Sequence, residues 1–174
     1  MRKFVENLSA VLDRVAGLSI RLAGVGLVLM TIFIAWQVFG RFVLNDTPTW
    51  TESSSVLIMG WFLLLGAASG IREGNHLSFD VLLFLFGPRS KAVAFTISDI
   101  VVVAFGGGMV VYGLQLAMKT WPTTIPNLGI SGGVAFLALI TGGALLVIYS
   151  IERLLRRAVG LPTTRFADKL AEPE

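Results

Sequence analysis

The stretch LAGVGLVLMTIFIAWQVFG, residues 22–40, contains no charged residue and decides the class of fold. A helix needs about 20 mostly apolar residues to cross a bilayer. Three further segments meet this condition, with Asp99 as their only charge: residues 53–71, 92–118 and 128–151. None of them shows the period of two that marks the strands of a membrane barrel. We therefore predict an all-α membrane protein with four transmembrane helices.

The composition of the chain also indicates a membrane protein. Of the 174 residues, 55% are hydrophobic and 14% are charged, whereas soluble domains usually carry about 25% charged residues. The chain has no cysteine and one histidine. These counts exclude thiolate nucleophiles, disulfides and any metal site that needs several histidines of this chain. We expect neither an enzyme nor a cofactor in this chain.

The lysines and arginines predict the orientation in the membrane. Twelve of the 14 fall on one side if both termini lie there together with the loop between the second and third spans. Only Arg41 and Lys119 fall on the other side. Basic loops tend to stay in the cytoplasm, so both termini are predicted to be cytoplasmic. Trp50 and Trp121 then lie at outer span ends, where interfacial tryptophans are common.

Two shorter segments have the pattern of helices at the membrane surface. In residues 4–18 the apolar side chains share one helical face, which predicts an amphipathic helix at the cytoplasmic interface. A plain extension of the first span is the alternative. Residues 77–86 are too short to span and precede a Gly-Pro breaker pair, so we expect a short interfacial helix there. Residues 1–160 would form one domain and residues 161–174 a mobile cytoplasmic tail.

Asp99 is the one acid inside a predicted span. A carboxylate at the bilayer centre costs at least ~2.5 kcal/mol, so such an acid is a functional candidate. It follows Lys91 by about 12 Å of helix, however. Asp99 can therefore lie near the interface and pair with Lys91 or Ser98, and we expect this structural role.

Polar residues also mark the predicted outer end of the first two spans. Gln37 and Arg41 are four residues apart and share a helical face. Glu52 opens the second span, where a carboxylate suits the positive helix N-terminus. Arg41 and Glu52 can each be solvated, or they can form a bridge that fixes the two helices or binds a partner.

A second polar group follows the second span in IREGNHLSFD, residues 71–80. His76 and Asp80 are four residues apart and would meet on a helix, close to Arg72. One histidine beside acids is a weak indication of a metal site. We expect a structural or docking role for these side chains.

Small residues mark possible helix contacts within the spans. Gly66 and Gly70 form a GxxxG pair. The third span contains three consecutive residues without side chains, Gly106, Gly107 and Gly108. Small faces allow helices to approach closely in lipid.

These motifs together resemble the small membrane subunit, or Q subunit, of tripartite ATP-independent periplasmic (TRAP) transporters. The resemblance covers roughly residues 15–155 and rests on the order and spacing of WQVFGRFVLNDTPTWTES, WFLLLGA, IREGNHLSFD and TTIPNLGIS. The matching positions are Gln37, Val38, Arg41, Phe42, Trp50, Glu52, Trp61, Gly66, Ala67, Arg72, His76 and Asp80. Ser53 and Ser55 depart from the family pattern, which often has a second Glu and an Arg there.

The resemblance implies a small permease subunit in a bacterial inner membrane. It would brace a large M subunit, form a heterodimer with it and serve uptake of an organic acid from a periplasmic binding protein. The M subunit would hold the sodium and substrate sites. Membrane lipids are the other expected partners, and no nucleic acid is expected.

A different reading remains open from the residues alone. The chain could be a self-sufficient small transporter that works as a homodimer. Asp99 would then be its proton-coupled acid.

Overall fold

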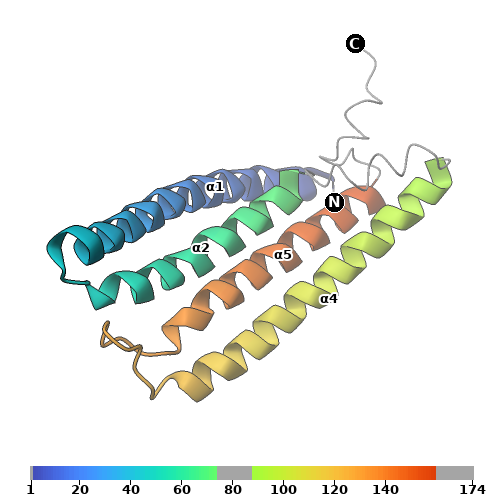
Figure 1. Ribbon diagram of the computed structural model, residues 1–174. Coiled ribbons are helices and arrows are strands. Elements are labelled where there is room, and N and C mark those ends of the chain that lie inside the picture. Colours follow the sequence, from blue (N-terminus) through green and yellow to red (C-terminus); the bar gives the residue numbers. More distant parts are fainter. Residues whose placement is uncertain (1, 74–87, 160–174) are drawn as a thin grey trace, which may run out of the picture.

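A computed structural model describes residues 2–73 and 88–159. In these residues the chain forms four α-helices (Figure 1): α1 Arg2–Phe39, α2 Thr49–Glu73, α4 Pro88–Thr120 and α5 Val134–Ala158. Each contains a stretch long and apolar enough to cross a membrane. The four-span all-α prediction is confirmed. The predicted interfacial helix at 77–86 and the tail at 161–174 lie outside the described residues.

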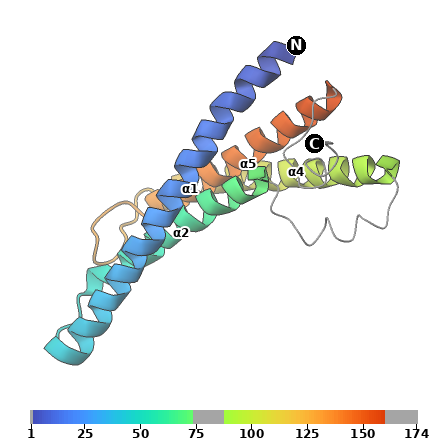
Figure 2. The same cartoon turned by 90° about the horizontal axis from the view of Figure 1, so that it is seen from above.

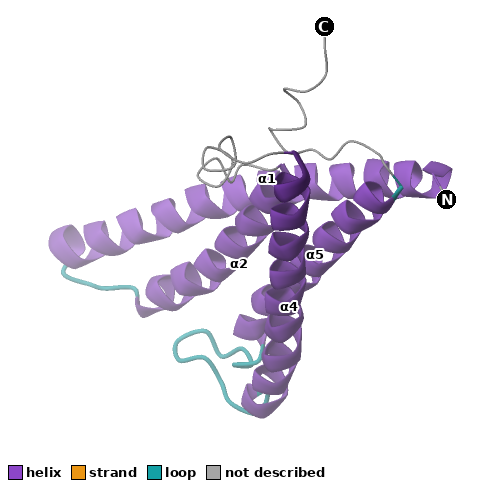
Figure 3. Cartoon of the chain, turned by 90° about the vertical axis from the view of Figure 1, so that its right-hand side faces the viewer, coloured by secondary structure: helices purple, strands orange, loops and turns teal. Residues whose placement is uncertain are grey.

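The four helices are arranged as two hairpins. α1 packs on α2, α4 packs on α5, and α2 and α5 join the hairpins. Figure 1 shows the order α1, α2, α5, α4, and Figure 3 shows the hairpins diverging towards their connecting loops. We call this the loop end. The opposite end, where α2 and α5 finish and α1 and α4 begin, is the charged end.

The N-terminal segment is helical, but it is continuous with the first span. α1 has 38 residues and measures about 57 Å at 1.5 Å per residue, nearly twice a bilayer core. It crosses the other helices obliquely (Figure 2). Val5 and Leu12 are buried, whereas Val11 and Leu18 of the same apolar face are more than half exposed, so packing within the protein covers only part of that face. The structure thus shows the alternative, an extension of the span, rather than a separate surface helix.

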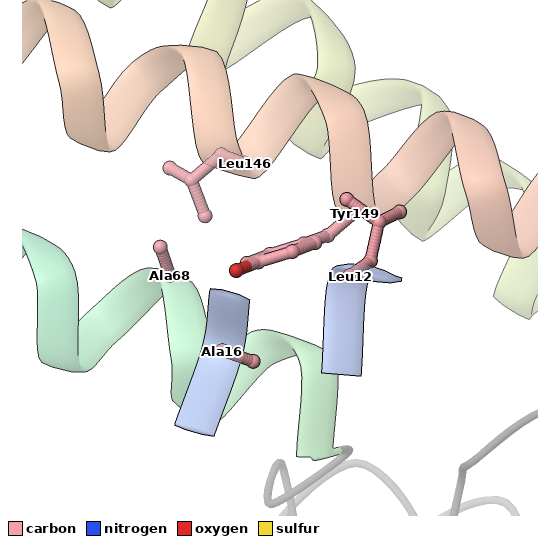
Figure 4. Packing of buried hydrophobic residues seen from close by; sticks show 5 residues of the cluster. All are labelled: Leu12, Ala16, Ala68, Leu146 and Tyr149. Atoms are coloured by element: carbon pink, nitrogen blue, oxygen red, sulfur yellow. The ribbon is translucent and has the colours of Figure 1, made fainter. Parts of the chain in front are cut away.

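Helices α1, α2 and α5 share a small hydrophobic core near the charged end (Figure 4). Ala16 and Ala68 are the small contacts of α1 and α2, which keep the two backbones close. Tyr149 of α5 is fully buried and fills the space between them, with Leu12 and Leu146 beside it.

Glycines set the close contact between α4 and α5. A Cβ added to Gly106 would lie 2.9 Å from the carbonyl oxygen of Gly143, and one added to Gly143 would lie 2.8 Å from that of Gly106. Of the three consecutive glycines in the third span, Gly106 makes this contact. Gly107 and Gly108 have no atom within 4 Å of an added Cβ.

The turn after α1 also depends on a glycine. The last turn widens into a π-helix, η1 Gly40–Leu44, and Asn45 ends it in the left-handed conformation with φ 51°. A Cβ on Gly40 would lie 2.7 Å from the carbonyl oxygen of Asp46 and 2.9 Å from Cδ of Pro48. The chain can fold back here because residue 40 lacks a side chain.

The fourth span begins later than its predicted start at residue 128. Residues 121–133 form a closed loop, in which the amide of Ile125 donates to Ile130 at 2.8 Å and that of Gly132 donates to Thr123 at 2.7 Å. Asn127 has φ 67°, which no helix can accommodate. Hydropathy counts the apolar residues of this loop as membrane-spanning because it does not detect turn geometry.

Candidate functional site

At the charged end, acids and arginines from all four helices form what we call the charged cluster. It contains three carboxylates and four guanidinium groups: Asp13 of α1, Arg72 of α2, Asp99 of α4, and Glu152, Arg153, Arg156 and Arg157 of α5.

Arg72 joins three helices within the charged cluster. Its Nη2 lies 2.8 Å from Oδ1 of Asp13, and its Nη1 lies 3.4 Å from Oε2 of Glu152. Nη2 also donates to the carbonyl oxygen of Ser9 at 3.0 Å. The guanidinium lies over the ring of Tyr149, 5.0 Å from its centroid. Arg72 is 4% exposed, so these contacts replace most of its hydration.

Glu152 receives further hydrogen bonds. The hydroxyl of Ser9 donates to its Oε1. Arg156, one turn later on the same helix, lies 3.6 Å from the same oxygen and donates to Ser9 Oγ at 3.3 Å. Glu152 is 3% exposed. Its burial is compensated by donors from α1, α2 and α5.

Asp99 is fully buried and pairs with two arginines of α5. Its Oδ2 accepts from Nη2 of Arg157 at 2.9 Å, and its Oδ1 lies 3.3 Å from Nη2 of Arg153. Arg157 also donates to Thr96 Oγ1 at 3.0 Å, and Arg153 donates to the carbonyl oxygen of Ile71 at 3.0 Å. We predicted Lys91 or Ser98 as the partner of Asp99; the ion pairs that the structure describes for Asp99 are with α5, and the side chain of Lys91 lies outside the described part of the chain.

The position of the charged cluster follows from the uncharged runs of the helices. The run after Asp99 extends from residue 100 to 118, and the run before Glu152 begins with α5 itself. Each is close to the length that crosses a bilayer. The cluster therefore lies where the apolar runs end, at the level of the headgroups, and not at the bilayer centre.

At the loop end, α1 and α2 enclose a groove of about 390 Å³. We call it the open groove. Its polar residues are Gln37, Arg41, Glu52 and Ser55, and its apolar residues are Met30, Ile34, Val56 and Met59.

The open groove brings together the side chains that we predicted at this end. Arg41 and Glu52 are both exposed, and no ion pair joins them in the described part of the chain. Arg41 lies 5.7 Å from the ring centroid of Phe42. Ser55 Oγ is buried without a hydrogen-bond partner among the described residues. The groove therefore offers one cation, one anion and a hydroxyl that the described chain does not use.

The remaining predicted residues are spread over the bundle. Trp50 packs edge-on against Phe33, with 5.4 Å between ring centroids. Trp61 is half-buried. Gly66 faces Ala23 across α1 and α2, at 3.7 Å from an added Cβ, whereas Gly70 faces open space.

His76 and Asp80 lie outside the described residues. In the described ranges, no group of three or more His, Cys, Asp or Glu side chains could hold a metal ion.

The sequence interpretation missed most of the charged cluster. It used the basic residues of ERLLRR, 152–157, only to predict orientation. The spacing held a further signal, since Arg153 and Arg157 are one turn apart on a face of α5, as are Glu152 and Arg156. An acid such as Asp99, inside an apolar run, needs partners of this kind.

Comparison with known proteins places the molecule in a family. Residues 30–160 match the DctQ component of tripartite ATP-independent periplasmic transporters. The sialic acid TRAP transporter small permease protein SiaQ of Vibrio cholerae is 25% identical over 121 residues, which is 70% of each chain. The C4-dicarboxylate TRAP transporter small permease protein DctQ of the same organism is 29% identical over 62 residues, 36% of this chain and 27% of that protein.

Proposed function

Since the chain belongs to the DctQ component family of TRAP transporters, it is a small permease subunit, and we propose that it braces a large M subunit in the membrane. It would do so as a heterodimer in a bacterial inner membrane, with both termini in the cytoplasm. This proposal makes the chain a structural partner in transport and not an enzyme.

The charged cluster is the observation that carries the bracing role. Arg72, Glu152 and Asp99 are almost fully buried and are engaged with groups of their own chain. Buried ion pairs of this kind fix the relative positions of the elements that carry them, because breaking one leaves an uncompensated charge. A rigid four-helix body with its interior charges satisfied is suited to support a moving partner.

The surface supports a partner as well. α1 and α4 carry many exposed large hydrophobic residues, among them Leu27, Ile34, Val101 and Phe105. In a membrane such faces meet lipid or another helix. We propose that the open groove, with exposed Arg41 and Glu52, contributes polar contacts to the M subunit.

In this proposal the other subunits of the complex, and not this chain, bind and move the solute. We propose that a sodium gradient drives uptake and that the sodium and substrate sites lie in the M subunit. A periplasmic binding protein would deliver the solute. The relatives are named for sialic acid and for C4-dicarboxylates, which supports an organic acid as the substrate class here.

The alternative of a proton-coupled homodimer is not favoured. It requires Asp99 to exchange protons with a transport path. Asp99 is enclosed between α4 and α5 and is engaged by Arg153 and Arg157.

Affinity purification of the C-terminally tagged chain from its native membrane tests the proposal. We expect a large polytopic protein at equal stoichiometry, identified by mass spectrometry. Arg41→Gln should reduce its recovery, and so should Glu52→Gln, whereas Lys119→Gln, an exposed charge on α4 at the same end, should not. Recovery of a lone homodimer would overturn the bracing role. Unchanged recovery of both groove variants would remove the open groove from the interface.

A further inference from the structure

A second hollow region lies on α1, on the side turned away from the bundle. It consists of two adjoining shallow hollows that share Arg21. One, of about 370 Å³, is lined by Asp13, Arg14, Gly17, Leu18 and Arg21. The other, of about 450 Å³, is lined by Arg21, Gly24, Val25, Val28 and Leu29. The surface is polar towards the N-terminus and apolar along the span.

The polar hollow carries a net positive charge. Arg14 and Arg21 are seven residues apart, so they lie on the same side of the helix, about 10 Å apart along its axis. Both are exposed, and in the described part of the chain neither forms an ion pair. The one acid of this hollow, Asp13, is bound by Arg72 through Nε at 3.1 Å and Nη2 at 2.8 Å. Two guanidinium groups thus remain without a counter-charge from the residues that the structure describes.

The apolar hollow begins at Arg21 and extends along α1 towards the loop end. Arg21 is the last charge before the uncharged run from residue 22 to 40. Since this run has the length of a bilayer core, Arg21 lies at the level of the lipid phosphates. Val25, Val28 and Leu29 then lie at the depth of the acyl chains.

Two glycines keep this surface hollow. A Cβ added to Gly17 or to Gly24 would meet no atom within 4 Å. These glycines are therefore not required for contacts among the described helices. They leave room for a ligand to approach the backbone of α1 beside each arginine.

We propose that this face of α1 binds an anionic phospholipid. The headgroup phosphate lies between Arg14 and Arg21, which donate hydrogen bonds to its oxygens, and an acyl chain follows Gly24, Val28 and Leu29 into the membrane. Guanidinium groups suit phosphate through paired, charge-assisted hydrogen bonds. Basic residues next to a span attract anionic lipid at about 1 kcal/mol each. A protein helix on this face would have to desolvate both arginines and supply acids in register, whereas a lipid supplies the charge and the apolar chain together.

Native mass spectrometry of the full chain, with any membrane partner that co-purifies, tests the site. Phosphatidylglycerol and phosphatidylcholine with identical acyl chains are added in equal amounts. Wild-type protein should retain phosphatidylglycerol at least about fivefold better. Arg14→Gln and Arg21→Gln should each reduce its retention about fivefold. Lys119→Gln, which removes one exposed charge at the loop end, should leave it unchanged.

A second pair of variants tests the shape of the hollow. Gly17→Leu should reduce retention of phosphatidylglycerol because it fills the space beside the arginines. Gly108→Leu is the matched control, since Gly108 also has nothing within 4 Å of an added Cβ. A reduction by the arginine variants with none by Gly17→Leu would show diffuse charge attraction and would overturn the built site.

Three further outcomes would overturn the proposal. Displacement of the bound lipid by excess glycerol phosphate would indicate a site for a free anion. A photoreactive side chain introduced at Gly24 should form adducts with the mass of a phospholipid; a covalent link to a second protein would assign this face to a protein partner. Equal retention of the two lipids by the wild type would exclude the anionic preference itself.

Discussion

At the charged end, Arg72 is 4% exposed and contacts Asp13, Glu152 and Tyr149. At the loop end, Arg41 and Glu52 are exposed and line a groove without pairing in the described residues. Both ends carry charged side chains from the hairpin of α1 and α2, and both adjoin long apolar helices. The charges of one end are used to hold the four helices together, and those of the other end remain available to a partner. A charged residue near a membrane span is therefore understood only from what surrounds it.

Replacement of Arg72 should have the largest effect. Arg72→Met removes the guanidinium from Asp13, from buried Glu152 and from the ring of Tyr149. Loss of one partner from a buried ion pair costs about 3–5 kcal/mol. Thermal unfolding in detergent, followed by circular dichroism, should show this loss. Arg41→Met is the matched control and should change stability by less than about 0.5 kcal/mol. Equal losses at the two ends would contradict the comparison.

Asp99→Asn should have a smaller effect on stability and little on transport. The amide keeps the shape of the side chain but loses the charge that Arg153 and Arg157 share. The Asn amide oxygen still accepts a hydrogen bond, and Arg157 is 22% exposed and can be hydrated, so the loss should be nearer that of hydrogen bonds to charged groups, about 1.5–3 kcal/mol. Transport by reconstituted complex, measured per assembled heterodimer, should stay near the wild-type rate. Complete loss of transport with normal assembly would instead revive a proton-coupled role for Asp99.

Much of the fold could be predicted because it depends on one-dimensional properties. An uncharged run of bilayer length, such as residues 22–40, has few stable alternatives to a helix. The boundaries were less accurate where local geometry decides them. Asn127 and Gly129 adopt positive φ values inside an apolar stretch, and hydropathy cannot detect this. Residues 4–18 show a real amphipathic pattern, but the pattern does not say whether protein or membrane covers the apolar face.

The two ends differ in how well their sites could be predicted. The open groove joins residues close to one short turn, so Gln37, Arg41 and Glu52 could be grouped from the sequence. The charged cluster joins Asp99 to Arg157 across two helices, and Arg72 to Glu152 across 80 positions. Such pairs depend on which helices are neighbours, and hydrophobic periodicity alone does not determine that order.

Gly40→Ala tests the turn that positions the open groove. The new methyl group would meet the carbonyl oxygen of Asp46 and the ring of Pro48. Crowding of this kind typically lowers stability by about 1–3 kcal/mol. The resulting distortion should affect η1, which carries Arg41. Thermal unfolding should detect the loss, and co-purification of the partner should fall with it. Gly108→Ala adds the same methyl group in open space and should not destabilise, because alanine favours a helix over glycine; a similar loss there would show that the cost is not specific to the crowded turn.

Ser53→Ala should have the smallest effect. The hydroxyl of Ser53 donates to the carbonyl oxygen of Pro126 at 3.2 Å and links α2 to the loop before α5. Because this bond is exposed to solvent, its loss should cost about 0.5 kcal/mol. Ser54→Ala, at the adjacent position, is the control for loss of a hydroxyl in the same turn. The loss of stability on Ser53→Ala could prove as large as that on Asp99→Asn. Strong contacts would then join the two hairpins at both ends of the bundle. The loop end could not adjust to a partner, which would contradict the comparison of the two ends.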